Sequence, residues 1–277
     1  MDKPAGPTSH DVVARVRRAL GTRAVGHTGT LDPLATGLLV VLVGPATRLA
    51  RFLEDRDKTY RATARLGVTT DTEDASGSET GRVEPDEWPG ESAVREAMAA
   101  LTGPQRQVPP AYSAKRVAGR RSYQLARAGR PVTLEAVPVT VARFECLGWR
   151  PPLLEFRVVV SAGTYVRSLA RDLGERLGLG AHLVALRREA IGDLSVDRAL
   201  PLEAIGPGTP LVPPHVLLAH LPGVALDQAQ RVAVGHGRLV RADGAEGRAR
   251  LMAGDELVAV AEAREAGWQP VVVLAGA

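Results

Sequence analysis

The segment RAVGHTGTLDPLATGLLVVLVG, from Arg23 to Gly44, constrains the fold most strongly. Its first half is rich in turn-forming residues, and its second half is an apolar run typical of a buried strand. Pro33 biases Asp32 toward an extended backbone. A lone Asp-Pro pair ordinarily caps a turn or a short helix, but a loop carboxylate backed by a rigid apolar strand is also how functional sites are supported. Asp32 is therefore a candidate functional residue.

Length and composition fit a chain with a sizeable core, because it has 277 residues of which 45% are hydrophobic. No apolar run has the length of a membrane span, and charged Asp2 and Lys3 follow Met1, so we expect a soluble, cytoplasmic protein. The single cysteine, Cys146, excludes an internal disulfide and lies in a strand-like run that favours a buried thiol. The histidines show no metal-ligand spacing, so we expect no metal or other cofactor.

The positive charge is carried almost entirely by arginine. The net charge is +4, and only three residues are lysine, namely Lys3, Lys58 and Lys115. The planar guanidinium suits phosphate binding and base stacking, which fits an RNA partner. Genome composition or heat adaptation can produce the same bias. The arginine content alone therefore does not assign a function.

Hydrophobic periodicity predicts both helices and strands along the chain. A helix is predicted to begin at Ser9 as N-cap and to stop at Gly21, and others are predicted over 93–101, 165–177 and 215–221. Strands are predicted over 58–68, 138–149, 152–160 and from 181 onward. From Val224 the chain changes to short alternating runs separated by glycine, which indicates a small β module. We place the domain boundary near residue 221, giving domains 1–221 and 222–277.

Two neighbouring stretches differ sharply in charge. Residues 69–91 are acidic and rich in glycine and proline, so we expect a solvated loop that would repel a polyanion. Residues 105–132 contain no acid and interleave cations with two tyrosines, which favours RNA contact over a merely solvated arginine-rich helix. The residues concerned are Arg106, Lys115, Arg116, Arg120, Arg121, Arg127 and Arg130, with Tyr112 and Tyr123.

Arg167 falls in the first turn of the predicted helix after SAGTY, where the helix dipole disfavours a cation. It therefore needs an anionic partner, either a phosphate or a carboxylate such as Asp32. If the two residues pair, we expect Arg167 to lower the pKa of Asp32 and keep it ionised. An ordinary surface arginine is the alternative. No second acid accompanies Asp32 for glycoside hydrolysis, and its motif lacks the lysine of a P-loop.

Several segments together resemble the TruB-type tRNA pseudouridine synthases. They are DKPAGPTSHDVV, RAVGHTGTLDPLATGLLVV, KTYRATARLG, PPAYSAKRVAGRRSYQLARAG, SAGTYVRSLARDLGERLG and GAHLVALRR, in that order and spanning about residues 1–200. The tail, residues 222–277, is similar to the small RNA-binding PUA module. The resemblance implies an α+β fold with a mixed, largely antiparallel central sheet flanked by helices and a small C-terminal β module.

The resemblance also implies the chemistry and the site. It implies a cofactor-free isomerase, working as a monomer on the T arm of tRNA, that flips out uridine 55, cleaves its N1–C1′ bond and rejoins the ring through C5. The catalytic residues implied are Asp32, Arg167 as its partner, Tyr165, and Tyr60 stacking on the base. Substrate contact or support of the site is implied for His27, Lys3, Pro4 and Leu186, while Arg116, Arg120 and Arg121 are expected from their charge to bind RNA.

Three functions stay open at this point. The first is tRNA isomerisation, and the second is a tRNA-folding chaperone that uses the same surface without chemistry. The third is guide-RNA-dependent modification, because guided relatives share the opening DKPxGPTSH motif. PLATGLL, PPAYSA and the acidic insertion favour the stand-alone type, for which we expect no guide RNA, no obligate protein partner and no membrane.

Overall fold

A computed structural model describes residues 1–113, 115–117, 120–122 and 134–274 of the chain. The chain forms two compact units. The first unit comprises Met1–Ser9, Leu31–Leu39 and Asp55–Leu202. The second comprises His10–Thr30, Val40–Glu54 and Glu203–Ala277. No helix in the described part of the chain is long and apolar enough to cross a membrane.

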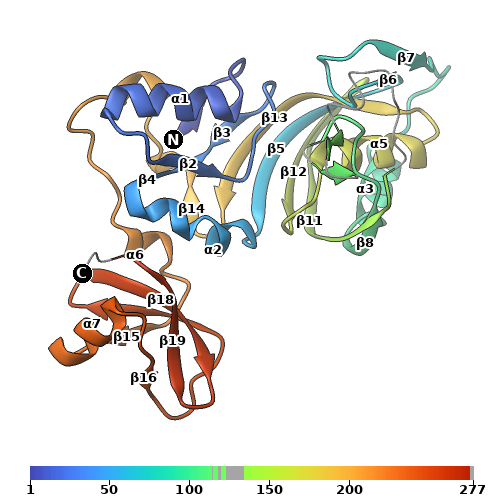
Figure 1. The fold of residues 1–277 in the computed structure, drawn as a ribbon. Coiled ribbons are helices and arrows are strands. Elements are labelled where there is room, and N and C mark those ends of the chain that lie inside the picture. The colour runs from blue at the N-terminus through green and yellow to red at the C-terminus, as the bar shows by residue number, and fades with distance from the viewer. Residues whose placement is uncertain (114, 118–119, 123–133, 275–277) are drawn as a thin grey trace. The chain divides into compact units, whose positions relative to one another are not determined.

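The first unit is built on a sheet of eight strands within the described residues, in the order β1-β3-β13-β5-β12-β11-β8, with β14 paired to β13 (Figure 1). Neighbouring strands are antiparallel except for β3 and β13, which confirms the mixed, largely antiparallel sheet expected from the sequence. The strands are β1 (Asp2–Lys3), β3 (Thr36–Leu38), β5 (Lys58–Leu66), β8 (Gly103–Gln107), β11 (Val137–Arg150), β12 (Leu153–Val160), β13 (Ala181–Ile191) and β14 (Leu194–Ser195).

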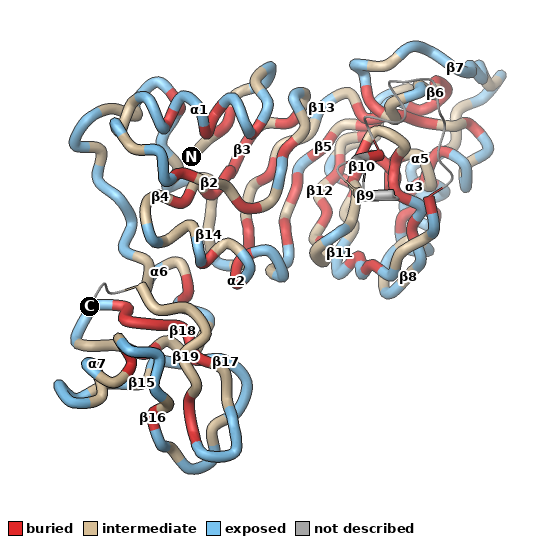
Figure 2. Tube along the Cα trace, in the orientation of Figure 1, coloured by how far each residue is buried: buried red, intermediate tan, exposed pale blue. Residues whose placement is uncertain are grey.

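Alternation of burial along the central strands explains why they form a sheet with one packed face. Buried and more exposed positions alternate along the central strands (Figure 2). In β5, Tyr60, Ala62 and Ala64 are buried while Arg61 and Arg65 are exposed, as the period of two requires. The helices α3 (Glu91–Ala99) and α5 (Val166–Arg176) contact β11 and β13 respectively. Both helices were predicted from the sequence, the second of them from apolar periodicity, and α5 ends before glycines with positive φ at 178 and 180.

The acidic stretch after β5 is folded more tightly than its composition suggested. It forms a hairpin of β6 (Val68–Thr70) and β7 (Glu79–Arg82), of which β7 is exposed throughout. The loop between them is fastened to β13, because Ala75 N–H donates to Leu183 O at 2.8 Å and Leu183 N–H donates to Glu73 O at 3.1 Å. The expectation of a solvated loop is therefore wrong for residues 72–74, which are buried or half-buried.

The apolar run GLLVVLVG is divided between the two units. Its first part is β3, whereas its second part is β4 (Val40–Val43), which pairs with β2 (Val25–Thr28) in the second unit. Leu39, between them, donates its N–H to Met1 O at 2.8 Å. Gly37 has φ of +98°, and a Cβ there would lie 2.3 Å from Arg188 O, so only glycine fits this close approach of β3 to β13. The single buried strand predicted from this run is therefore two short strands.

The second unit contains the N-terminal helix and the C-terminal β module. Its five-stranded sheet, within the described residues, has the order β15-β17-β18-β19-β16 and a core around Val234, Leu251, Val258 and Trp268. The boundary near residue 221 stays a prediction. The elements are α1 (Ser9–Leu20), η1 (Gly44–Leu49), α2 (Arg51–Glu54), α6 (Pro214–Leu217), β15 (Gly223–Ala225), α7 (Gln228–Gly235), β16 (Val240–Arg241), β17 (Arg248–Ala253), β18 (Glu256–Arg264) and β19 (Gly267–Val273).

Two details of the helices differ from the prediction. The helix α7 was not predicted, although Asp227 and Gln230 form a capping box at its start. Ser9 is the first residue of α1, and its hydroxyl donates to Leu31 O at 3.0 Å and accepts from Leu31 N–H at 2.9 Å. The serine predicted to cap the helix therefore holds the loop of Asp32 instead.

Candidate active site

The loop that carries Asp32 is fixed from both sides by the opening residues of the chain. Within the loop, Ala35 N–H donates to Asp32 O at 3.1 Å and closes a tight turn. Ser9 clamps Leu31 as described above, and Gly6 N–H donates to Pro33 O at 2.9 Å. These bonds hold the backbone, so the Asp32 side chain is free to face another part of the unit rather than cap its own turn.

Lys3 is the central support of this loop. Its side chain is fully buried, and its ammonium donates to Pro4 O at 2.8 Å, Ala35 O at 2.7 Å and Pro33 O at 3.4 Å. Three carbonyls match the three donors of an ammonium group, which is how a buried lysine is tolerated. Burial lowers the pKa of Lys3, and the charge of Asp32 opposes this. Lys3 and Pro4 thus support the site from beneath the loop.

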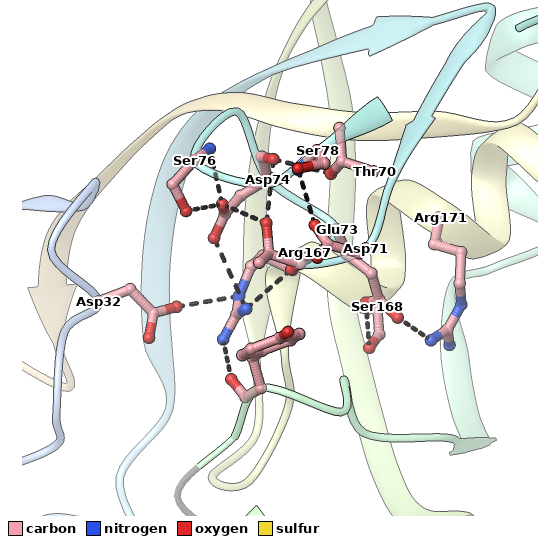
Figure 3. Close-up of polar contacts among 12 residues, drawn as sticks. Asp32, Thr70, Asp71, Glu73, Asp74, Ser76, Ser78, Arg167, Ser168 and Arg171 are labelled. Atoms are coloured by element: carbon pink, nitrogen blue, oxygen red, sulfur yellow. Dashed lines mark hydrogen bonds and ion pairs between the residues drawn. The ribbon is translucent and has the colours of Figure 1, made fainter. Parts of the chain in front are cut away.

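Arg167 makes the contact expected from its position against the helix dipole. Its Nε lies 3.0 Å from Asp32 Oδ2, its Nη1 donates to Thr72 O at 2.9 Å, and its Nη2 donates to Tyr112 O at 2.9 Å (Figure 3). The side chain is only 6% exposed. Every nitrogen of the guanidinium is engaged, so three loops converge on one side chain. The predicted pairing of Asp32 with Arg167 is confirmed.

A second carboxylate, Asp74, faces the same guanidinium. Its Oδ2 lies 3.6 Å from Arg167 Nη1, and its side chain is 6% exposed. Asp74 Oδ1 accepts from Thr72 Oγ1 at 2.8 Å and from Ser76 N–H at 2.9 Å. Arg167 therefore lies between Asp74 and Asp32 (Figure 3). The Asp74 carboxylate is enclosed, whereas the Asp32 side chain is 39% exposed.

Burial and charge act in opposite directions on Asp32. Burial raises the pKa of the Asp32 carboxyl above its usual value, and the Asp74 carboxylate raises it further. Arg167 and Lys3 lower the pKa but do not outweigh burial. The expected lowering of the Asp32 pKa by Arg167 is confirmed, but the net shift is upward because burial, the largest cause, penalises the charged carboxylate.

The start of α5 is pinned by a glutamine that sequence reasoning did not single out. Gln107 is 1% exposed, its Oε1 accepts from Tyr165 N–H at 2.8 Å, and its Nε2 donates to Tyr165 O at 3.1 Å. Tyr165 directly precedes α5, so this bridge fixes the helix end that carries Arg167. Burial raises the pKa of the Tyr165 hydroxyl, and the Ser113 hydroxyl and the Arg167 charge oppose this.

Tyr60 and Leu186 occupy one face of neighbouring strands. Tyr60 on β5 lies opposite Arg188 on β13, and Leu186 lies opposite Ala62, two residues along from Tyr60. Because side chains two apart share a face, the register places Tyr60 and Leu186 on the same side of the sheet. Arg188 is 1% exposed there, and its Nε donates to Leu38 O at 2.7 Å. Their roles toward a substrate stay predictions.

The remaining predicted residues lie on other elements of the chain. His27 lies on β2 of the second unit, edge-on to His10 with ring centroids 5.4 Å apart. Arg116 lies on β9 (Arg116–Val117), and Arg120 and Arg121 form β10, but their side chains lie outside what the structure describes. Tyr123, Arg127 and Arg130 also lie outside the described residues. In the described part of the chain, no group of His, Cys, Asp and Glu side chains is arranged to hold a metal ion.

Asp74 is the most important residue that sequence reasoning missed. The charge of its segment, TDTEDASGS, predicts a solvated loop. The density of threonine, serine and glycine around the acids was a usable signal, because these residues form side chain to backbone bonds that make compact loops. Nothing in the local sequence marks Arg167, 93 residues away, as the partner of Asp74.

Comparison with known proteins places this fold and site. The structure is similar to a solved protein–RNA assembly titled "Structure of H/ACA RNP bound to a substrate RNA containing 2'-deoxyuridine", with a TM-score of 0.74, 25% identity, and coverage of 99% of this chain and 83% of that one. A Cbf5-Nop10-Gar1 complex matches with a TM-score of 0.73 and 27% identity over 99% of this chain and 84% of that one. The fold is therefore that of the pseudouridine synthases.

The sequence comparisons are more specific. Residues 17–166 match the family described as "TruB family pseudouridylate synthase (N terminal domain)". Residues 167–206 match the family described as "tRNA pseudouridylate synthase B C-terminal domain". A Thermobifida fusca protein named tRNA pseudouridine synthase B is 47% identical over 100% of this chain and 97% of its own length. A Leifsonia xyli protein of the same name is 48% identical over 89% of this chain and 84% of its own length. The chain belongs to the TruB family of pseudouridylate synthases.

Proposed function

We propose that this protein isomerises uridine 55 in the T loop of tRNA to pseudouridine, with Asp32 as the catalytic carboxylate. The observation that carries the proposal is the arrangement of Asp32, which is held by Arg167 at 3.0 Å while its side chain stays 39% exposed. The names of the similar proteins support tRNA as the substrate class. The position within tRNA rests on the resemblance of the GHTGTLDPLATG and GTYVRS motifs.

The geometry suits an isomerisation within one nucleotide. The N1–C1′ bond of uridine breaks, the ring turns, and a C5–C1′ bond forms as C5 loses its proton and N1 gains one, so atoms balance without a reactant water or a cofactor. The exposed carboxylate oxygen of Asp32 can act at the ring or at the sugar, and Arg167 stabilises its charged form. Rigid support by Lys3 and Ser9 keeps the carboxylate in place.

The uridine must leave its stack to reach Asp32, which costs a few kcal/mol. We assign Tyr60 to offset part of this cost by stacking on the extruded base, and Leu186 to contact the base from the same side of the sheet. His27 is assigned to hold the flipped-out loop. Arg116, Arg120 and Arg121 supply positive charge for the tRNA backbone, so tRNA affinity should fall steeply with salt.

Release of tritium from C5-labelled tRNA tests the proposal. We expect Asp32→Asn to abolish release, by at least about 1000-fold, while tRNA affinity changes by less than about threefold, because asparagine keeps the shape but not the charge. An unmodified T-arm hairpin and the same hairpin with cytidine at position 55 serve as substrate and control. Turnover retained by Asp32→Asn would overturn the proposal.

The same variant separates chemistry from binding. A tRNA-folding activity that persists in Asp32→Asn assigns a chaperone role to the RNA-binding surface alone. Purified protein and naked tRNA are the only components of the assay. Turnover that required added RNA or protein would replace stand-alone action with guided modification.

A further inference from the structure

A second acid–arginine pair joins the loop of Asp74 to α5, one helical turn beyond Arg167. Arg171 Nη1 donates to Glu73 Oε1 at 2.5 Å, and Ser168 Oγ donates to Glu73 Oε2 at 3.0 Å (Figure 3). The Glu73 side chain is 15% exposed, and Ser168 is fully buried. The pair of residues 73 and 171 thus runs beside the pair of residues 74 and 167, between the same loop and the same helix.

The backbone conformation of Glu73 does not favour glutamate, so the contacts of its side chain must explain why a glutamate occupies this position. Glu73 has φ of +61°, the only positive φ at a non-glycine residue in the described part of the chain. This left-handed conformation favours glycine or asparagine. A glutamate is held there because both of its carboxylate oxygens are bonded to α5.

We propose that Glu73 is a positioning residue for the isomerisation, acting through its neighbours in the loop on Arg167 and thereby on Asp32. The proposal rests on the proposed function for its activity readout. Its physical basis is the sharing of one donor group: Arg167 Nη1 bonds Thr72 O at 2.9 Å and faces Asp74 Oδ2 at 3.6 Å.

The route from Glu73 to Asp32 is short. Glu73 lies between Thr72 and Asp74 in the chain, so a displacement of its backbone moves both acceptors of Arg167 Nη1. The opposite side of the guanidinium, Nε, is 3.0 Å from Asp32 Oδ2. A displacement of about 1 Å at a catalytic group can cost roughly 100-fold in rate. Anchoring the loop to Ser168 and Arg171 therefore fixes the geometry of the reacting carboxylate.

The experiment compares Glu73→Gly with Glu73→Gln and with a matched control, Glu79→Gln. Glycine removes the side chain and relieves the backbone, so we expect a melting temperature at or above that of the wild type. We expect kcat for tritium release to fall roughly 10- to 100-fold with KM within about twofold. Glu73→Gln keeps part of the hydrogen bonding to α5, so its kcat should lie between those of the wild type and Glu73→Gly. Glu79 pairs with Arg82 on the exposed strand β7, and its variant should match the wild type.

A wild-type kcat in Glu73→Gly overturns the proposal, as does a rise in KM with kcat unchanged, because that result would assign Glu73 to RNA binding. A loss of kcat that is fully explained by a lower melting temperature, and thus by a smaller folded fraction, overturns the proposal as well. An inactive wild type would instead refute the proposed function. In that case the pKa of Asp32, followed by carboxyl carbon NMR, decides: it should rise in Glu73→Gly if Arg167 is displaced, and an unchanged value counts against the proposal.

Discussion

Asp32 and Asp74 contact the same guanidinium but differ in what surrounds them. The Asp74 side chain is 6% exposed, and its Oδ1 is occupied by Thr72 and Ser76. The Asp32 side chain is 39% exposed, Arg167 Nε contacts its Oδ2, and Ala35 N–H bonds its backbone carbonyl. A fully occupied carboxylate can orient an arginine, whereas a partly open one can also meet a substrate. Under the proposed function, the difference between the two surroundings, and not the residue type, separates Asp74 as a positioning acid from Asp32 as the reacting one.

Removing Arg167 should have the largest effect, because both carboxylates then lose their shared cation. We expect Arg167→Met to lower kcat/KM roughly 1000-fold and to lower the free energy of unfolding by about 3 kcal/mol. Tritium release and urea unfolding measure the two effects. Arg176→Met, an exposed arginine at the end of the same helix, is the control. Equal losses in Arg167→Met and Arg176→Met would show that the contacts of Arg167 with Asp32 and Asp74 are not the cause of the effect.

Removing the charge of Asp74 should have a smaller effect on activity than removing Arg167. Its main effect should be on the pH dependence of kcat/KM. The Asp74 carboxylate raises the pKa of Asp32, so Asp74→Asn should move the acid limb of the kcat/KM profile to lower pH. We expect a loss of kcat of about tenfold at neutral pH, because Arg167 is less well oriented. Asp86→Asn, in the exposed part of the acidic stretch, should leave the profile in place. An acid limb that moves to higher pH in Asp74→Asn would contradict the assigned charge coupling between Asp74 and Asp32.

The smallest effect concerns stability. Because the pKa of Asp32 is raised in the folded protein, the folded state binds a proton more tightly than the unfolded state. The contribution of Asp32 to stability is therefore fully present below the ordinary carboxyl pKa and is lost as pH rises through the folded pKa. Asp32→Asn should remove this dependence, and the difference should stay below about 1 kcal/mol because the partly exposed carboxylate is screened by solvent. Unfolding of both proteins from pH 4 to 8 measures it, and parallel curves would refute it.

The sequence allowed prediction of those features that depend on short patterns. The alternation in KTYRATARLGV and the periodicity of VRSLARDLGERL gave β5 and α5, and the position of Arg167 against the helix dipole correctly indicated an acidic partner. The same reasoning placed Cys146 in a strand, where it is buried. In each case the physical cause lies within a few residues of the pattern.

Features that depend on distant partners could not be predicted. Asp74 and Glu73 looked solvated because their charge was visible and their partners on α5 were not. The run GLLVVLVG looked like one strand because the break at Leu39 is set by pairing with Met1 and by the approach of Gly37 to β13. The net pKa shift of Asp32 depends on distant residues in the same way, since the lowering by Arg167 could be predicted while the extent of burial could not.

The division of the chain between the two units also has a temporal consequence. The chain changes unit after residues 9, 30, 39 and 54, and again after 202, so neither unit is a continuous stretch of the polypeptide. On the ribosome, Asp32 is made 135 residues before Arg167 (167 minus 32). At usual elongation rates this delay is on the order of ten seconds. The carboxylate therefore emerges without its arginine, and the nascent chain gains a complete reaction centre only when most of its length has been translated.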